Sequence, residues 1–154
     1  MSAVKVSDLF KESTGWYDFF IDFHDYKLCG DLPDIFGRDE ELDLADMFHI
    51  HLAATEAVQA KWRAAKLQFR RTTDPDQPED DFWLIYAYDL LRDEYLLLTI
   101  LGPDAHSREQ WGLICGICIQ KLWALGSWGR SSIAIQTKTN EPVCSDGLKR
   151  KTLI

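Results

Sequence analysis

Apolar side chains recur at every third or fourth position near the N-terminus, and this spacing predicts an amphipathic helix over residues 14–28. Ser13 and Thr14 suit its N-cap, and Gly30 suits its end. Residues 3–6 are predicted to form a short edge strand before it. The apolar positions of the predicted helix are Trp16, Phe19, Phe20, Phe23 and Tyr26.

The middle of the chain contains a predicted loop and two predicted strands, and the hydrophobic pattern of the first strand is ambiguous. Residues 32–39 include a proline and a glycine and are predicted to be a loop. Residues 48–52 alternate between apolar and polar side chains, which favours a half-buried strand, although the alanine-rich continuation also permits a helix. Residues 66–72 are predicted to form the next strand.

The second half of the chain starts with an aromatic, β-branched pattern typical of a hairpin. Residues 82–89 and 94–101 are its predicted strands, joined by a turn at 90–93. Helical spacing then returns over residues 107–125, and residues 126–154 have weak periodicity. A strand, a helix, an antiparallel sheet and a closing helix make an α+β fold.

The length of 154 residues suits one domain. We expect a core domain over residues 1–126 and an irregular C-terminal extension over 127–154. The chain has neither a signal-peptide pattern nor an apolar run long enough to cross a bilayer, so a cytoplasmic location is expected, without membrane contact. The four cysteines are expected to be reduced, and their spacing suggests no zinc site.

The net charge of −8 is unevenly distributed. Residues 61–71 carry five basic and no acidic side chains, which is suitable for local contact with phosphate. The alternative is a solvated cationic surface without a ligand. The predicted RNA contacts in this segment are Lys61, Arg63, Lys66, Arg70 and Arg71.

Several short motifs resemble those of YafO-family toxins, in the same order along the chain. They are YKxxGxLPDIFGRD at residues 26–39, HIHLA at 49–53, QFxRT at 68–72, LxY at 84–86, and a strand at 97–101 followed by Pro103 and His106. The segment between the second and third motifs departs from the family pattern, and the chain extends beyond the family core after residue 126.

The resemblance implies a RelE/ParE-like fold, in which a curved antiparallel sheet carries an N-terminal helix layer and a C-terminal helix. It also implies the toxin of a type II toxin–antitoxin system. Such a toxin is expected to cleave translated mRNA on the 70S ribosome without a metal or cofactor, and to be neutralised by a cognate antitoxin.

RNA cleavage without a metal needs a base for the ribose 2′-hydroxyl, an acid for the leaving oxygen and cations for the phosphate. His49 and His51 share one face if they lie on a strand, and His106 follows the last core strand. Arg71 is expected to neutralise the phosphate, and Tyr86 to stack on a base. The three histidines and Arg71 are the catalytic candidates, and each also has a purely structural interpretation. In that interpretation one of the paired histidines is a hydrogen-bonded core residue, His106 only begins a helix, and Arg71 pairs with the acidic loop.

Two other functions fit part of the pattern. The acidic composition is compatible with a non-enzymatic immunity or antitoxin-like protein that blocks a basic partner. A RelE-fold toxin that acts on another target, such as gyrase, is the second alternative, because a fold alone does not determine activity.

Overall fold

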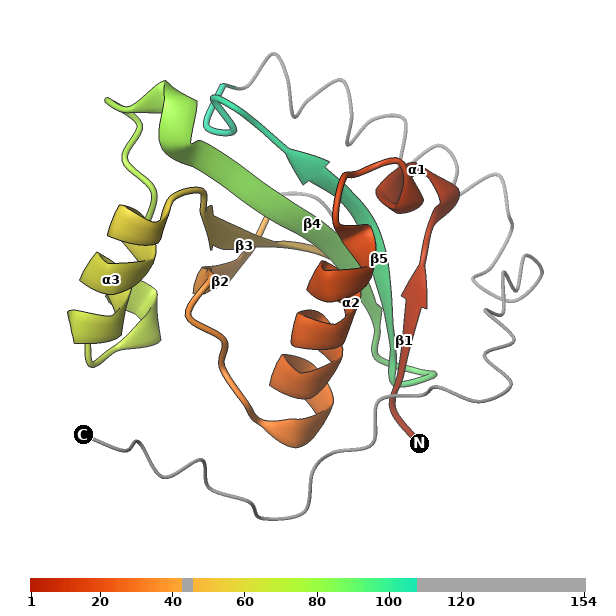
Figure 1. Ribbon diagram of the computed structural model, residues 1–154. Helices are drawn as coiled ribbons and strands as arrows, with labels where there is room; N and C mark the ends of the chain where they lie inside the picture. The colour runs from red at the N-terminus through yellow and green to blue at the C-terminus, as the bar shows by residue number, and fades with distance from the viewer. Residues whose placement is uncertain (43–45, 108–154) are drawn as a thin grey trace.

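The computed structural model describes residues 1–42 and 46–107. They form one five-stranded sheet with the strand order β1-β5-β4-β3-β2. Helix α2 lies across one face of the sheet, and α3 lies beside the edge formed by β2 and β3 (Figure 1). The strands are β1 (Ala3–Val6), β2 (Phe36–Glu41), β3 (Met47–Ala53), β4 (Asp81–Asp89) and β5 (Glu94–Leu101).

The predicted N-terminal helix is confirmed, with a later start than expected. It consists of α2 (Trp16–His24) and a π-helical turn (Asp25–Cys29), and it ends at Gly30, whose φ of 80° suits glycine. A short helix that the spacing did not predict, α1 (Asp8–Lys11), precedes it. Its N-terminus is capped by Ser7, whose hydroxyl accepts the backbone N–H of Phe10.

The prediction of a loop over residues 32–39 is wrong in its second half, where β2 begins. The strand pairs antiparallel with β3, and the register shifts between Phe36 and Asp39. Four charged side chains in a row, at residues 38–41, conceal this strand from a hydrophobicity pattern. An edge strand tolerates them, because only one of its sides is covered by another strand.

The predicted strand over residues 48–52 is confirmed as β3, and the alanine-rich continuation is a separate helix, α3 (Glu56–Ala64). Thr55 separates the two elements, because its hydroxyl accepts the backbone N–H of Val58 and caps the helix.

The predicted strand over residues 66–72 is wrong. The segment contains only a 3-10 turn (Gln68–Arg70), and a second such turn (Pro78–Asp80) leads into β4. Strand β3 already has β2 on one side and β4 on the other, so the sheet offers this segment no place beside β3. The segment instead joins β2 through a backbone hydrogen bond of 2.7 Å from the N–H of Arg38 to the carbonyl of Arg71.

The hairpin of β4 and β5 is confirmed, but the sheet is not wholly antiparallel, because β1 pairs parallel with β5. The chain therefore has the expected α+β class with a mixed sheet. The predicted helix over 107–125 and the boundary between residues 1–126 and 127–154 lie outside the described residues. No helix in the described part of the chain is long and apolar enough to cross a membrane.

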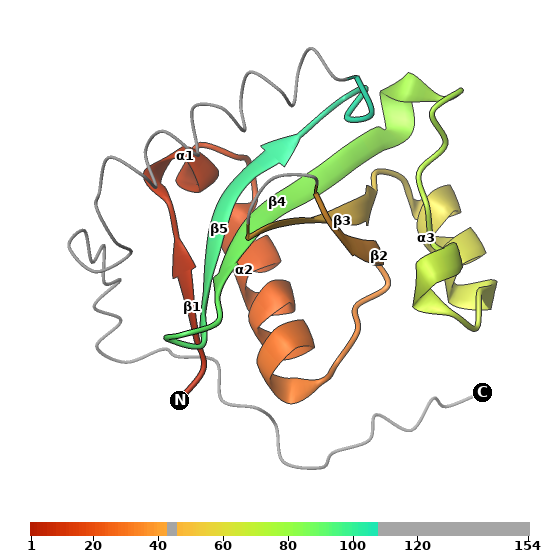
Figure 2. The same cartoon turned by 180° about the vertical axis from the view of Figure 1, so that it is seen from behind.

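The two faces of the sheet have different cores. Seen from behind, β4 and β5 pass in front of the upper part of α2, so the helix lies on one face of the sheet (Figure 2). That face carries the larger core, which includes Phe10, Phe23, Phe36, Ile50, Leu84 and Leu97. The opposite face carries Met47, Trp83, Ile85, Ala87, Leu98 and Leu101. Because side chains alternate along β3, His49 and His51 lie on the face opposite α2.

Candidate functional site

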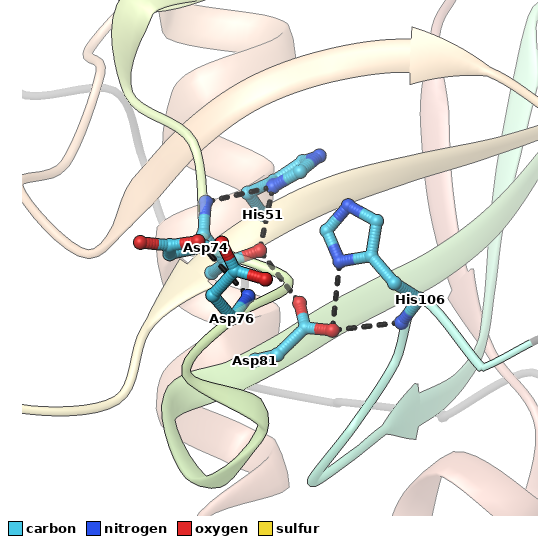
Figure 3. A network of polar contacts seen from close by, with 6 residues as sticks. His51, Asp74, Asp76, Asp81 and His106 are labelled. Carbon is cyan, nitrogen blue, oxygen red and sulfur yellow. Dashed lines mark hydrogen bonds and ion pairs between the residues drawn. The ribbon is translucent and has the colours of Figure 1, made fainter.

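His106 is attached to the start of β4 by a buried carboxylate. Its Nδ1 and its backbone nitrogen each lie 2.7 Å from Oδ2 of Asp81, whose side chain has no exposed surface. Figure 3 shows both contacts. If Nδ1–H donates to this oxygen, the Nε2 of His106 is left as the nitrogen that can exchange a proton. The imidazole is 32% exposed, so it is open to a ligand.

The loop after β5 brings His106 to this position. Asp104 donates its N–H to the carbonyl of Pro78, and Ala105 donates to the carbonyl of Asp81. Gly102 begins the loop with a φ of 143°. A Cβ there would lie 2.4 Å from the ring of Phe82, so both the backbone conformation and the space require glycine.

His51 belongs to the same network through Thr73 (Figure 3). The backbone N–H of Thr73 donates to Nδ1 of His51 at 3.0 Å, so the proton of the neutral imidazole is on Nε2. The hydroxyl of Thr73 also lies 2.8 Å from this Nδ1 and donates to Oδ1 of Asp81 at 2.6 Å. Asp81 therefore accepts hydrogen bonds on both oxygens, and these hydrogen bonds offset the cost of burying its carboxylate.

The three candidate histidines of the site lie together. Ring centroids are 5.1 Å apart for His49 and His51, and 5.6 Å apart for His51 and His106. Trp83 is in the middle, with centroids 4.3 Å from His49 and 4.7 Å from His106. The structure therefore places them on one side of the sheet, while their catalytic roles remain predictions.

Burial distinguishes His49 and His51 from the more accessible His106. It lowers the pKa of His51 to about 3, and the neighbouring imidazoles of His49 and His106 add to the effect. Burial also lowers the pKa of His49, against the opposing influence of Glu40. Both side chains are therefore neutral near pH 7 and almost inaccessible, at 7% and 3% exposure for His49 and His51. Among these three, His106 is the one suited to proton exchange with a substrate.

Arg71 directly follows the 3-10 turn and does not lie on a strand, contrary to the strand predicted over residues 66–72. Its guanidinium lies 3.4 Å from the carbonyl of Phe36, and its Nε is buried without a hydrogen-bond partner among residues 1–42 and 46–107. Thr73, two residues further on, contacts His51. Arg71 thus lies on the segment that borders the histidine cluster, and its contact with phosphate remains a prediction.

The basic segment is largely solvent-exposed. Lys61, Arg63, Lys66 and Arg70 are all exposed. Arg63 forms an ion pair of 2.8 Å with Asp34. Within the described residues no carboxylate lies within 4 Å of the charged groups of the other three. Most of this positive charge is therefore available to a ligand.

The ring of Tyr86, which was predicted to stack on a base, lies in the core on the α2 face and is 3% exposed, and this burial argues against the predicted role. Its hydroxyl donates to Oδ1 of Asp39 at 2.8 Å, while Tyr26 and Lys27 donate to Oδ2. Burial and the Asp39 carboxylate raise the pKa of both tyrosines, that of Tyr26 to about 12. This network joins the π-helical turn to β2 and β4, and it explains part of the YKxxGxLPDIFGRD motif as structural.

One group of donor side chains is close enough together to be considered as a metal site. In residues 1–42 and 46–107, one group of three has its ligand atoms within 4.8 Å of one another: His24, Asp25 and Cys29. Cys29 is disulfide-bonded, so it offers no thiolate, and the expectation of reduced cysteines is wrong at this position. This group is on α2 and the turn after it, not in the histidine cluster.

Two residues of the site were missed by sequence reasoning, Asp81 and Thr73. Asp81 is the first residue of β4 and follows several acidic residues of the preceding loop, and no local pattern in the sequence distinguishes its buried carboxylate from the exposed ones. The available signal was its position directly before the apolar strand predicted over residues 82–89.

A family model described as Toxin YafO, type II toxin-antitoxin system, matches residues 24–117, which is more than half of the chain. The chain belongs to the YafO toxin family. It is therefore the toxin of a type II pair, with a cognate antitoxin as its partner. The YafO match includes β2 to β5 and both Asp81 and His106. No curated protein and no solved structure matches the chain.

Proposed function

We propose that this YafO toxin is a ribosome-dependent endoribonuclease that cleaves translated mRNA without a metal. The observation that carries the proposal is the pairing of the partly exposed His106 with the buried Asp81. A histidine held in one tautomer by a carboxylate is a general arrangement for proton transfer near neutral pH.

In the proposed reaction, Nε2 of His106 removes the proton from a ribose 2′-hydroxyl. The 2′-oxygen then attacks the adjacent phosphorus, and the bond from phosphorus to the 5′-oxygen of the next nucleotide breaks. The products are a 2′,3′-cyclic phosphate and a 5′-hydroxyl end. Asp81 keeps the imidazole in the required orientation and stabilises the imidazolium that forms.

The leaving 5′-oxygen must receive a proton from a second group. Within the described part of the site, the buried His49 and His51 are unsuited to this role, because burial keeps both neutral. We assign this proton to the ribosomal environment, which agrees with the dependence on translation that the family resemblance implies.

Positive charge for the phosphate is assigned to Arg71 and to the exposed Lys61, Arg63, Lys66 and Arg70. Because the chain as a whole carries a net charge of −8, long-range attraction to free RNA is weak. The cationic segment therefore acts at close range, once the ribosome has brought mRNA and toxin together.

The decisive experiment is to induce the toxin in cells and to map mRNA ends by primer extension, with and without translation of the monitored transcript. We expect new 5′ ends only in the translated transcript, and the purified toxin should leave naked RNA almost intact. Growth arrest without new mRNA ends would contradict the proposal and would point to another target, such as gyrase. Efficient cleavage of naked RNA would refute the requirement for the ribosome.

A further inference from the structure

We propose that the ring of Phe69, flanked by the guanidinium groups of Arg38 and Arg70, is a stacking platform for a base of single-stranded RNA. The inference rests on the proposed function, since it assigns how the substrate is held. It concerns binding alone, so it can fail or succeed independently of cleavage.

The first observation is the exposure of the ring. Phe69 is 55% exposed, although a phenylalanine of this size normally contributes to a core. The amide of Gln68, one of its chain neighbours, is bound to the Gly37 carbonyl, and the exposed Arg70, its other neighbour, has its guanidinium beside the ring. The turn therefore presents an aromatic surface to solvent.

The second observation is the rigidity of the turn. The Nε2 of Gln68 donates to the Tyr26 hydroxyl and to the Gly37 carbonyl, both at 2.9 Å. The Nε of Arg38 donates to the carbonyl of Phe69 at 2.6 Å. These hydrogen bonds hold the backbone of the turn in place, so less conformational entropy is lost when a base stacks on the side chain that the turn carries.

The third observation is the charge beside the ring. The guanidinium carbons of Arg38 and Arg70 lie 5.8 and 5.9 Å from the ring centroid. Both are near the outer limit of about 6 Å for a cation–π contact, so they leave ring surface open for a base. Arg38 has Glu40 at 3.5 Å, whereas Arg70 has no carboxylate partner within the described residues.

This combination favours RNA over a protein partner. An exposed aromatic ring binds any base by stacking, and adjacent arginines meet the phosphates on either side of that base. An acidic peptide would use the cations but would leave the face of the ring without a matching group. The neighbouring Leu67 is 49% exposed and serves as an internal comparison.

The test measures binding of a fluorescein-labelled oligouridine by anisotropy at low salt, with a strand of equal length that lacks the bases as the second probe. Phe69→Ala should weaken oligouridine binding by about 5- to 150-fold, because stacking on an aromatic side chain contributes about 1–3 kcal/mol per base. Phe69→Trp should retain affinity, and Leu67→Ala should bind as the parent does. On the strand without bases, Phe69→Ala and the parent should bind equally.

Three results would overturn the inference: no binding of oligouridine by the parent, unchanged affinity in Phe69→Ala, or the same loss on the strand without bases. Unchanged RNA affinity in Phe69→Ala together with loss of antitoxin binding would assign the ring to the antitoxin instead. If the base-dependent loss is found but mRNA is never cleaved on ribosomes, the platform stands and the nuclease function fails.

Discussion

The Nδ1 of His106 lies 2.7 Å from Oδ2 of Asp81, although 25 residues separate them along the chain. The loop after β5 and the start of β4 are both needed for this contact. The contact engages Nδ1 of the imidazole and leaves Nε2 accessible for proton exchange.

His106→Ala should lower translation-linked mRNA cleavage by about 10²–10⁴-fold, because a general acid or base contributes about that factor. The measurement is primer extension in translating extracts with purified toxin. His24→Ala is the matched control, since His24 also lies beside a carboxylate, Asp25, but outside the cluster. Full activity in His106→Ala, with a normal unfolding curve, would exclude the proposed role.

Asp81→Asn should reduce cleavage by about 10²–10⁴-fold through the orientation of His106. It should also lower the free energy of unfolding by about 1–3 kcal/mol, because the buried amide cannot accept every hydrogen bond of the carboxylate. Asp80→Asn, which removes a charge at the neighbouring position and keeps Asp81, is the control.

A purely structural role of Asp81 would change stability alone, so the tautomer of His106 must be measured as well. Nitrogen NMR shifts of the imidazole should report a proton on Nδ1 in the parent and a different distribution in Asp81→Asn. Identical shifts in the two proteins would rule out the positioning role.

The toxin should lose stability on acidification between about pH 6.5 and pH 3, and His51 should be one cause. Burial lowers its pKa from 6.5 to about 3 in the folded state. Below pH 6.5 the unfolded chain binds a proton at this position and the folded chain does not. The free energy of unfolding then falls by up to about 1.4 kcal/mol per pH unit for this group.

Urea unfolding at several pH values tests this for His51→Asn, whose side-chain oxygen can still accept the N–H of Thr73 but cannot titrate. The variant should show a shallower loss of stability with acid than the parent. Equal slopes in the two proteins would mean that His51 is not buried in its neutral form.

Tyr86→Phe should lower the free energy of unfolding by about 1.5–3 kcal/mol, because it removes a hydrogen bond to the Asp39 carboxylate. Tyr17→Phe, at a position with 42% exposure, should change stability by no more than about 0.5 kcal/mol. RNA affinity should stay the same in Tyr86→Phe. Unchanged stability with weakened RNA binding would restore the stacking role that burial argues against.

The sequence by itself determined the elements with strong periodicity and the family. The aromatic spacing of α2, the alternation in β3 and the hairpin of β4 and β5 are local signals, since each element contributes apolar side chains to the core under α2. Local patterns failed at β2, where charged side chains occupy an edge, and at residues 66–72, where β3 had no free side.

Only the tertiary structure decided the composition of the site. The sequence placed His49 and His51 on one face of a strand and put His106 after the last strand. It could not show that Asp81 and Thr73 connect them, that Tyr86 is turned to the α2 face, or that Phe69 is exposed. Burial and hydrogen bonding between distant segments depend on how strands are ordered in the sheet. A local sequence pattern does not determine that order.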